Sequence, residues 1–165
     1  MTAPTTIRAL TVAPLDIPLH EPFGIASGAQ EVARNLLVAV ELTDGTRGYG
    51  EAAPFPAFNG ETQDMAHAAI LAARSLVEGA DVREWRRIAL ALPALPVMTG
   101  SARCAIETAI LDALTCRARL PLWALFGGVA TRIETDVTVP TGGIAAAARA
   151  ARQGIEDRRF YGTAR

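Results

Sequence analysis

Residues 44–62 read DGTRGYGEAAPFPAFNGET, and this stretch joins two kinds of secondary structure. Asp44 and Gly45 form a tight-turn signal, and residues 47–52 alternate as a half-buried strand does. The stretch ends at Thr62, a residue type that often caps a helix. The sequence therefore predicts a hairpin that leads, through a loop with prolines, into a helix.

The glycines of this stretch have three possible roles: a phosphate cradle, an ordinary hairpin turn, or part of a substrate pocket. A dinucleotide fingerprint needs a helix directly after the glycine loop, so that the helix N-terminus faces the pyrophosphate. No helix signal follows Gly50 until Thr62. We therefore assign Gly45 to the turn, and we expect close backbone approach or a bulge at Gly48 and Gly50.

The segments before the turn complete an antiparallel meander. Residues 7–19 alternate apolar and polar side chains, with Pro14 as an interruption, and residues 34–42 are rich in leucine and valine. With residues 47–52 these segments predict a three-stranded antiparallel sheet.

Helical signals follow the meander. Glu61 and Asp64 would lie near the positive end of the first helix dipole, and Asp81 with Glu84 resembles a capping box. Four helices are expected, from Thr62 to about Leu76, from Asp81 to Pro93, from Ser101 through Cys116, and from Pro121 to Gly127.

The third of these helices carries a narrow stripe of small apolar residues suited to close packing. The stripe consists of Ala102, Ala105, Ile106, Ala109, Ile110, Ala113 and Leu114. Cys104 and Cys116 share this helix, and at ~1.5 Å rise per residue their Cα atoms would lie roughly 18 Å apart, beyond disulfide reach. We expect both cysteines to be buried. His20 and His67 have no partners at metal-site spacing, so we expect no zinc site.

The C-terminal part changes pattern again. Residues 134–140 read as a short strand and residues 144–153 as an alanine-rich helix, which is the repeating unit of a parallel α/β architecture. One such unit cannot bury its own strand, so a second domain is expected to begin here.

Composition excludes several classes of protein. The chain of 165 residues is 50% hydrophobic, and its net charge of −1 gives no reason to expect a nucleic acid or a membrane as partner. No signal peptide is expected, and a cytoplasmic protein is the default. All sixteen Lys and Arg residues are arginine, so this chain cannot complete a mechanism that needs a lysine base.

Two acidic residues are candidate acid–base groups. Glu51 follows Gly50 on a strand, and Asp112 lies within an apolar helix. No second carboxylate pairs with either in sequence, so we expect Glu51 to be solvated or paired with arginine and Asp112 to pair with arginine.

Two loops carry aromatic residues. One, HEPFGIASGAQ, places Phe23 and Ile25 between two strands, and the other, APFPAFNGE, places Phe55 and Phe58 between prolines. Loops of this kind close over small ligands in many enzymes. The alternative, that these aromatics cover the local core, is equally compatible with the sequence.

These motifs together resemble one family. The order of LPLHEPFGIASG, NLLVAVELTDGTRGYGEAAPFPAFNGET, SARCAIETAILDALTCRARLPLWALFGG and TDVTV is similar to the N-terminal part of the enolase superfamily, in its mandelate racemase and muconate-lactonizing branch. Within that branch, PLHEPFGIASG looks most like the dipeptide epimerases.

The resemblance implies an α+β fold: an enolase-like capping domain over residues 1–128, a truncated first β/α unit of a (β/α) barrel over residues 129–153, and an aberrant tail over residues 154–165. A frameshift near Asp157 and a deliberately shortened chain are alternative origins of that tail. The resemblance also implies substrate-binding roles for the loops and the barrel mouth. These roles fall to Phe23, Ile25, Ser27, Phe55, Phe58 and Thr138.

The implied chemistry is Mg²⁺-dependent epimerisation of dipeptides such as L-Ala-D/L-Glu, in which lysines remove and return the proton α to a carboxylate. The family's catalytic lysines and metal ligands lie on barrel strands beyond the resembling region. We therefore expect no catalytic residue and no metal ligand in this chain, and no activity from it alone. A muconate cycloisomerase, an o-succinylbenzoate synthase-like enzyme and a non-catalytic fragment remain alternatives, and a homo-oligomer is compatible with the sequence.

Overall fold

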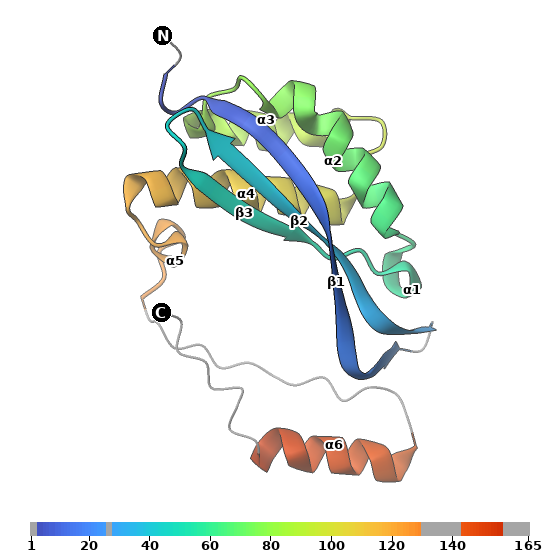
Figure 1. Cartoon of the computed structure of the whole chain (residues 1–165). Coiled ribbons are helices and arrows are strands. Elements are labelled where there is room, and N and C mark those ends of the chain that lie inside the picture. Colours follow the sequence, from blue (N-terminus) through green and yellow to red (C-terminus); the bar gives the residue numbers. More distant parts are fainter. Residues whose placement is uncertain (1–2, 26–27, 130–142, 157–165) are drawn as a thin grey trace.

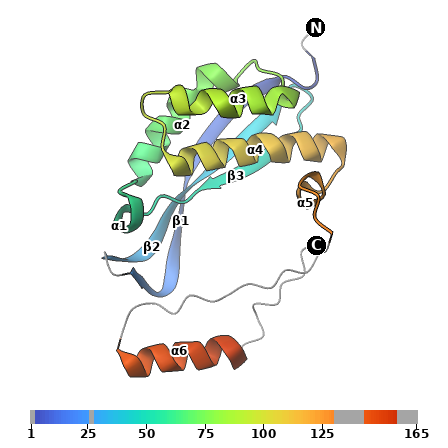
Figure 2. The ribbon, with the colours of Figure 1, turned by 180° about the vertical axis from the view of Figure 1, so that it is seen from behind.

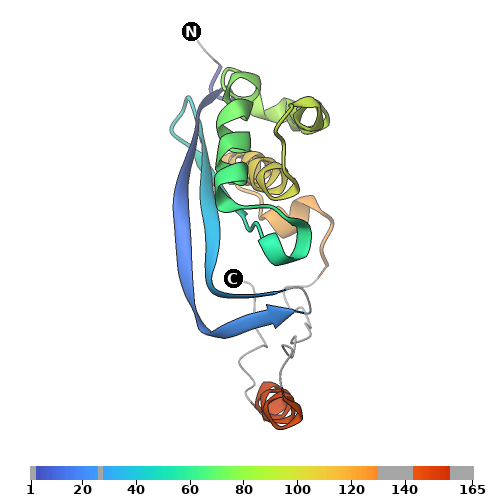
Figure 3. The same cartoon turned by 90° about the vertical axis from the view of Figure 1, so that its right-hand side faces the viewer.

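The fold has two layers, an antiparallel sheet and a set of helices that covers one of its faces (Figures 1 and 3). The computed structural model describes residues 3–25, 28–129 and 143–156. The sheet has the order β1-β2-β3, formed by Ile7–Ile25, Gly28–Leu42 and Arg47–Ala52. The predicted α+β meander is therefore confirmed.

Strands β1 and β2 extend well beyond the predicted bounds. Residues 20–30, expected to be a loop, are mostly the arms of a long hairpin in which Phe23 pairs with Gln30 and Ile25 with Gly28. The register shifts between Pro18 and Phe23, where the chain contains two prolines that cannot donate ladder hydrogen bonds. Figure 3 shows the far end of this hairpin curving toward the helical side of the sheet.

The helices follow the order expected from their capping residues. Thr62 caps α2, because its hydroxyl accepts a hydrogen bond from the backbone N–H of Met65 at 3.2 Å. The helical segments are α1 (Pro56–Asn59), α2 (Gln63–Val77), η1 (Val82–Glu84), α3 (Trp85–Ala91), η2 (Leu92–Ala94), α4 (Gly100–Ala118), α5 (Leu122–Leu125) and α6 (Ile144–Glu156).

The capping box predicted at Asp81 and Glu84 forms only in part. Asp81 accepts a hydrogen bond from the backbone N–H of Arg83, so the segment opens as a 3-10 turn. The Glu84 carboxylate pairs with Arg87 instead of returning to the cap. The reciprocal half of the prediction is wrong because a nearby guanidinium supplies a charged partner for Glu84.

Helix α4 lies directly against β3, and Figure 2 shows it crossing the sheet on the covered face. A Cβ atom built on Gly48 would lie 2.0 Å from the backbone N of Ala113. Ala102, Ala105, Ile106, Ala109, Ile110 and Ala113 of the predicted stripe are buried, and Leu114 packs against the same core. The prediction of close backbone approach at the strand glycines is confirmed.

The prediction that Cys104 and Cys116 are buried is wrong. Both side chains are exposed and free. Helix α4 buries most of the stripe together with Leu111 and Thr115, and neither cysteine is among its buried residues. The general tendency of cysteine to be buried does not say which face of a helix it occupies.

The predicted helix 144–153 corresponds to α6, which Figure 1 shows apart from the two-layer body. The predicted strand 134–140 lies outside the described residues. None of the helices in the described ranges is long and apolar enough to cross a membrane.

Candidate functional site

The two aromatic segments singled out in the sequence meet in space. Phe23 lies on the β1 arm of the hairpin and Phe55 lies just before α1, and their ring centroids are 6.1 Å apart with a tilt of 53°. This is a favourable tilted arrangement for two aromatic rings. A second contact joins the same segments, since a Cβ built on Gly28 would lie 2.9 Å from the Cβ of Ala57.

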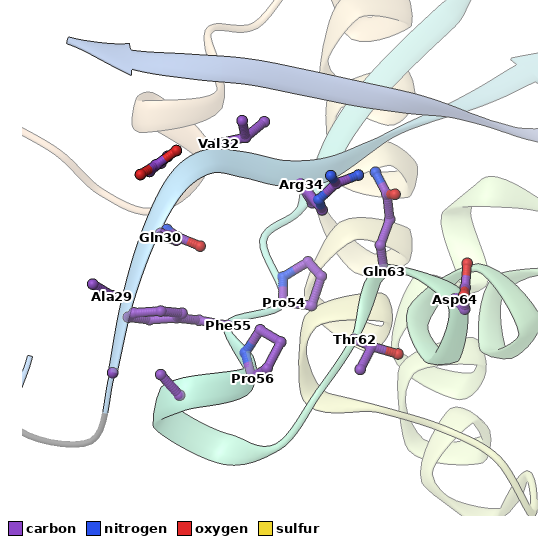
Figure 4. Close-up of a pocket in the computed structure, with 13 residues that line it drawn as sticks. Ala29, Gln30, Val32, Arg34, Pro54, Phe55, Pro56, Thr62, Gln63 and Asp64 are labelled. Atoms are coloured by element: carbon purple, nitrogen blue, oxygen red, sulfur yellow. The ribbon is translucent and has the colours of Figure 1, made fainter. Parts of the chain in front are cut away.

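A hollow of about 680 Å³ lies between the start of β2, the segment 54–57 and the start of α2. Figure 4 shows Pro54, Phe55 and Pro56 on one side of it and Gln30, Val32 and Arg34 of β2 on another. Its lining residues are Gly28, Ala29, Gln30, Glu31, Val32, Arg34, Pro54, Phe55, Pro56, Ala57, Thr62, Gln63 and Asp64. The hollow therefore combines apolar rings with both signs of charge.

The other predicted substrate-binding residues have different positions. Phe58 lies on α1, is 78% exposed, and does not line the hollow. Ile25 is the last residue of β1, at the hairpin end. Ser27 and Thr138 lie outside the described residues. The structure thus brings Phe23 and Phe55 together and leaves Phe58 facing solvent beside them.

A polar cluster at the hollow was missed by the sequence analysis. The Gln63 amide donates to Asp16 Oδ1 at 2.7 Å and to the backbone carbonyl of Asn35 at 2.8 Å. Arg34 lies 3.8 Å from Asp16 on the same side. These contacts connect the start of α2 to β1 and β2. They could not be predicted from a short sequence motif, because the partners lie far apart in the chain.

Glu61 connects the aromatic segment 53–61 to helix α4. Its Oε1 accepts from the backbone N–H of Gly100 at 2.8 Å, and its Oε2 accepts from that of Ser101 at 3.0 Å. Glu61 directly precedes the Thr62 cap of α2, as expected, but its carboxylate contacts the N-terminus of a different helix, α4. Partial burial raises the Glu61 pKa, but hydrogen bonds from Ser101 and Gly100 outweigh that effect and lower the pKa overall.

Within the described part of the chain, neither Glu51 nor Asp112 pairs with an arginine. Glu51 accepts a hydrogen bond from the Asn35 amide at 2.5 Å, and Asp112 accepts one from the backbone N–H of Tyr49 at 2.8 Å. Both contacts hold β3 in place, Glu51 through its neighbour β2 and Asp112 through α4. The arginine pairing predicted for Asp112 is wrong, because its carboxylate instead accepts from the backbone N–H of edge strand β3.

The described residues do not fit a metal centre. Within residues 3–25, 28–129 and 143–156, no three His, Cys, Asp or Glu side chains converge as a metal site requires. The magnesium implied by the sequence resemblance therefore has no ligand set in this part of the chain.

The fold and the aromatic segments agree with a known family. The N-terminal domain of mandelate racemase / muconate lactonizing enzyme matches residues 7–127. This chain belongs to that family. The residues matched contain the sheet, helices α1 to α5 and both aromatic segments, so the α+β body is the N-terminal capping domain of this group of the enolase superfamily.

Several proteins with similar sequences carry the name epimerase, and others are mandelate racemase/muconate lactonizing enzymes. An aromatic dipeptide epimerase from Herpetosiphon aurantiacus is 51% identical over 149 residues, which is 90% of this chain and 42% of the relative. A crystal structure of a mandelate racemase/muconate lactonizing enzyme from Roseiflexus sp. is 85% identical with a TM-score of 0.83, covering 92% of this chain and 40% of that one.

A third member of the family was solved with ligands. The dipeptide epimerase from Enterococcus faecalis, complexed with Mg and the dipeptide L-Leu-L-Tyr, is 28% identical to this chain with a TM-score of 0.86, covering 92% of this chain and 43% of that one. The chain thus spans about two fifths of the length of these relatives.

Proposed function

We propose that residues 7–127 act as the capping domain of a Mg²⁺-dependent dipeptide epimerase of the cytoplasm, and that residues 129–153 begin its barrel. The reaction removes the proton α to the substrate carboxylate on one face, and a second group delivers a different proton to the opposite face. The observation that carries the proposal is the contact of Phe23 with Phe55 beside the hollow. The similarity to an aromatic dipeptide epimerase supports it.

In this proposal the aromatic pair forms a wall for a large apolar side chain of the dipeptide. Two rings in contact present a rigid apolar surface, and burying a substrate ring against it excludes water from the reacting carbon. Ile25, Ser27 and Phe58 would border the same subsite from the hairpin end and α1, and Thr138 would contribute from the barrel mouth.

The acid–base groups and magnesium ligands would come from residues other than those described. The chain contains no lysine, and the described residues do not form a metal site. The cap would therefore act by binding and orienting the substrate and by enclosing it, while proton transfer takes place on the barrel.

A hybrid enzyme tests the proposal. Residues 7–127 of this chain would replace the matching segment of the Herpetosiphon aurantiacus epimerase, and exchange of the substrate α-proton in D₂O with Mg²⁺ would be followed by NMR. We expect epimerisation of aromatic dipeptides in preference to dialanine. A folded hybrid that cycloisomerises muconate, or that shows no preference for aromatic dipeptides, would overturn the assignment.

A further inference from the structure

We propose that Glu61 is a positioning residue that sets the substrate selectivity of the cap by holding the segment 53–61 on helix α4. This inference rests on the proposed function for its activity readout. Its geometry does not depend on that function. The position to be fixed is that of Phe55, because the Phe55 ring both meets Phe23 and lines the hollow.

The segment 53–61 is buried at Pro54, whereas α1 within it lies at the surface. Helix α1 is a single turn of four residues with no buried residue, and it ends at Gly60 in a left-handed conformation with φ of 77°. Such a short helix has little stability of its own. The Asn59 side chain accepts from the backbone N–H of Glu61 at 3.0 Å, which orders the residues just before the carboxylate.

Glu61 attaches the end of this segment to α4. Its two carboxylate oxygens each accept one of the first N–H groups of α4, which have no acceptor within their own helix. Hydrogen bonds to a charged acceptor are about twice as strong as neutral ones, and the helix dipole adds to them. The same helix packs with its stripe on β3, so α4 is a fixed support.

Loss of this support would free Phe55 to move away from Phe23. A mobile wall would weaken binding of a large side chain and would leave a methyl side chain almost unaffected. Glu61 would therefore act on KM for aromatic dipeptides and not on the chemical step, since it contacts backbone N–H groups and not the substrate.

Hydrogen exchange of the 165-residue chain tests whether Glu61 holds the N-terminus of α4. In Glu61→Ala we expect the Gly100 and Ser101 amides to exchange about 10-fold faster, the equivalent of losing charge-assisted hydrogen bonds. The Ala102 amide donates to the Thr99 hydroxyl at 3.2 Å and should keep its protection. Unchanged exchange at Gly100 and Ser101, or an equal rise at all three amides, would overturn the proposal.

Kinetics of the hybrid enzyme test the consequence. Glu61→Ala should raise KM for an aromatic dipeptide by about 10-fold, the factor that ~1.4 kcal/mol represents, with kcat and the KM for dialanine within about twofold. Glu61→Gln, which keeps one acceptor oxygen, should give an intermediate value. Ser101→Pro removes both the backbone N–H and the hydroxyl that Ser101 offers to Glu61, at a position in the first helical turn where proline is tolerated, and should act in the same direction.

A matched control separates this effect from general loss of charge. Glu84→Ala removes an exposed carboxylate that pairs with Arg87 on α3, and should change none of these readouts. If the unmodified hybrid epimerises no dipeptide, the proposed function fails and hydrogen exchange still decides the link. If it is active and Glu61→Ala leaves the selectivity for aromatic over alanine dipeptides unchanged, the positioning role is refuted.

Discussion

A Cβ atom built on Gly50 would lie 2.0 Å from the carbonyl oxygen of Ala105, so β3 and α4 are in backbone contact at this point. A Cβ atom built on Gly48, two residues earlier on β3, would likewise lie 2.0 Å from the backbone N of Ala113. Two glycines on a strand and a stripe of alanines on a helix therefore act as one packing unit. This unit holds the helix that supports the aromatic segment.

Replacing Gly50 with alanine should disrupt this contact and lower the free energy of unfolding. Overpacking against a fixed backbone commonly destabilises a protein by up to ~3 kcal/mol, and here the three nearest atoms are all backbone atoms of α4. We expect Gly50→Ala to lose about 3 kcal/mol or more in urea unfolding. Gly45→Ala is the matched control: nothing lies within 4 Å of its Cβ, and only its φ of 86° opposes the change. It should lose about 1–2 kcal/mol, and equal losses at both sites would contradict the account.

The contact between Phe23 and Phe55 should appear as a coupling energy. In a double-mutant cycle of the two alanine variants we expect about 0.5–1.5 kcal/mol of coupling in the free energy of unfolding. Leu90 is 80% exposed on α3, so Leu90→Ala combined with Phe55→Ala should be additive. A cycle with no coupling between Phe23 and Phe55 would show that the two rings do not support each other.

Stability should depend on the charge of Asp81. The Arg83 guanidinium bonded to this carboxyl, together with the Arg83 backbone N–H and the Thr5 hydroxyl, holds the Asp81 pKa well below its ordinary value. A depressed carboxyl pKa contributes stability above about pH 4 that is lost as the pH falls through the folded-state pKa. Asp81→Asn should therefore lose about 0.5–1 kcal/mol at pH 7, because its charged contacts are lost, as measured by urea unfolding.

The same Asp81→Asn difference should shrink at low pH, because below about pH 4 the unfolded chain binds a proton at Asp81 before the folded protein does. Glu84→Gln is the control, since its exposed pair with Arg87 should contribute at most about 0.5 kcal/mol at either pH. An Asp81→Asn effect of equal size at pH 7 and pH 2.5 would show that charge is not its cause.

The 165-residue chain alone should not exchange the α-proton of a dipeptide. It has no lysine to remove that proton, and the residues described in the structure do not form a metal site. NMR in D₂O with Mg²⁺ and an aromatic dipeptide should show no exchange above a protein-free control. Turnover that scales with the concentration of this chain would contradict the expectation.

The sequence predicted local features well and distant contacts poorly. The turn at Gly45 and the cap at Thr62 depend on neighbours in the chain. The close backbone approach at Gly50 could be predicted because a glycine on a strand has no side chain to keep a helix away. The bond from Glu61 to Gly100 joins residues whose proximity depends on the whole fold. Likewise, whether Cys104 is exposed depends on which side of α4 the sheet covers. The hairpin over residues 20–30 was missed because its pairing is decided by the opposite strand.

The most direct measurement of the central claim is the ratio of kcat/KM for an aromatic dipeptide to that for dialanine, in the hybrid enzyme and in its Phe55→Ala variant. If residues 7–127 form a cap whose Phe23–Phe55 wall receives the substrate side chain, the ratio should fall about 10-fold in the variant, mainly through KM. A ratio that is the same in both enzymes would contradict the account.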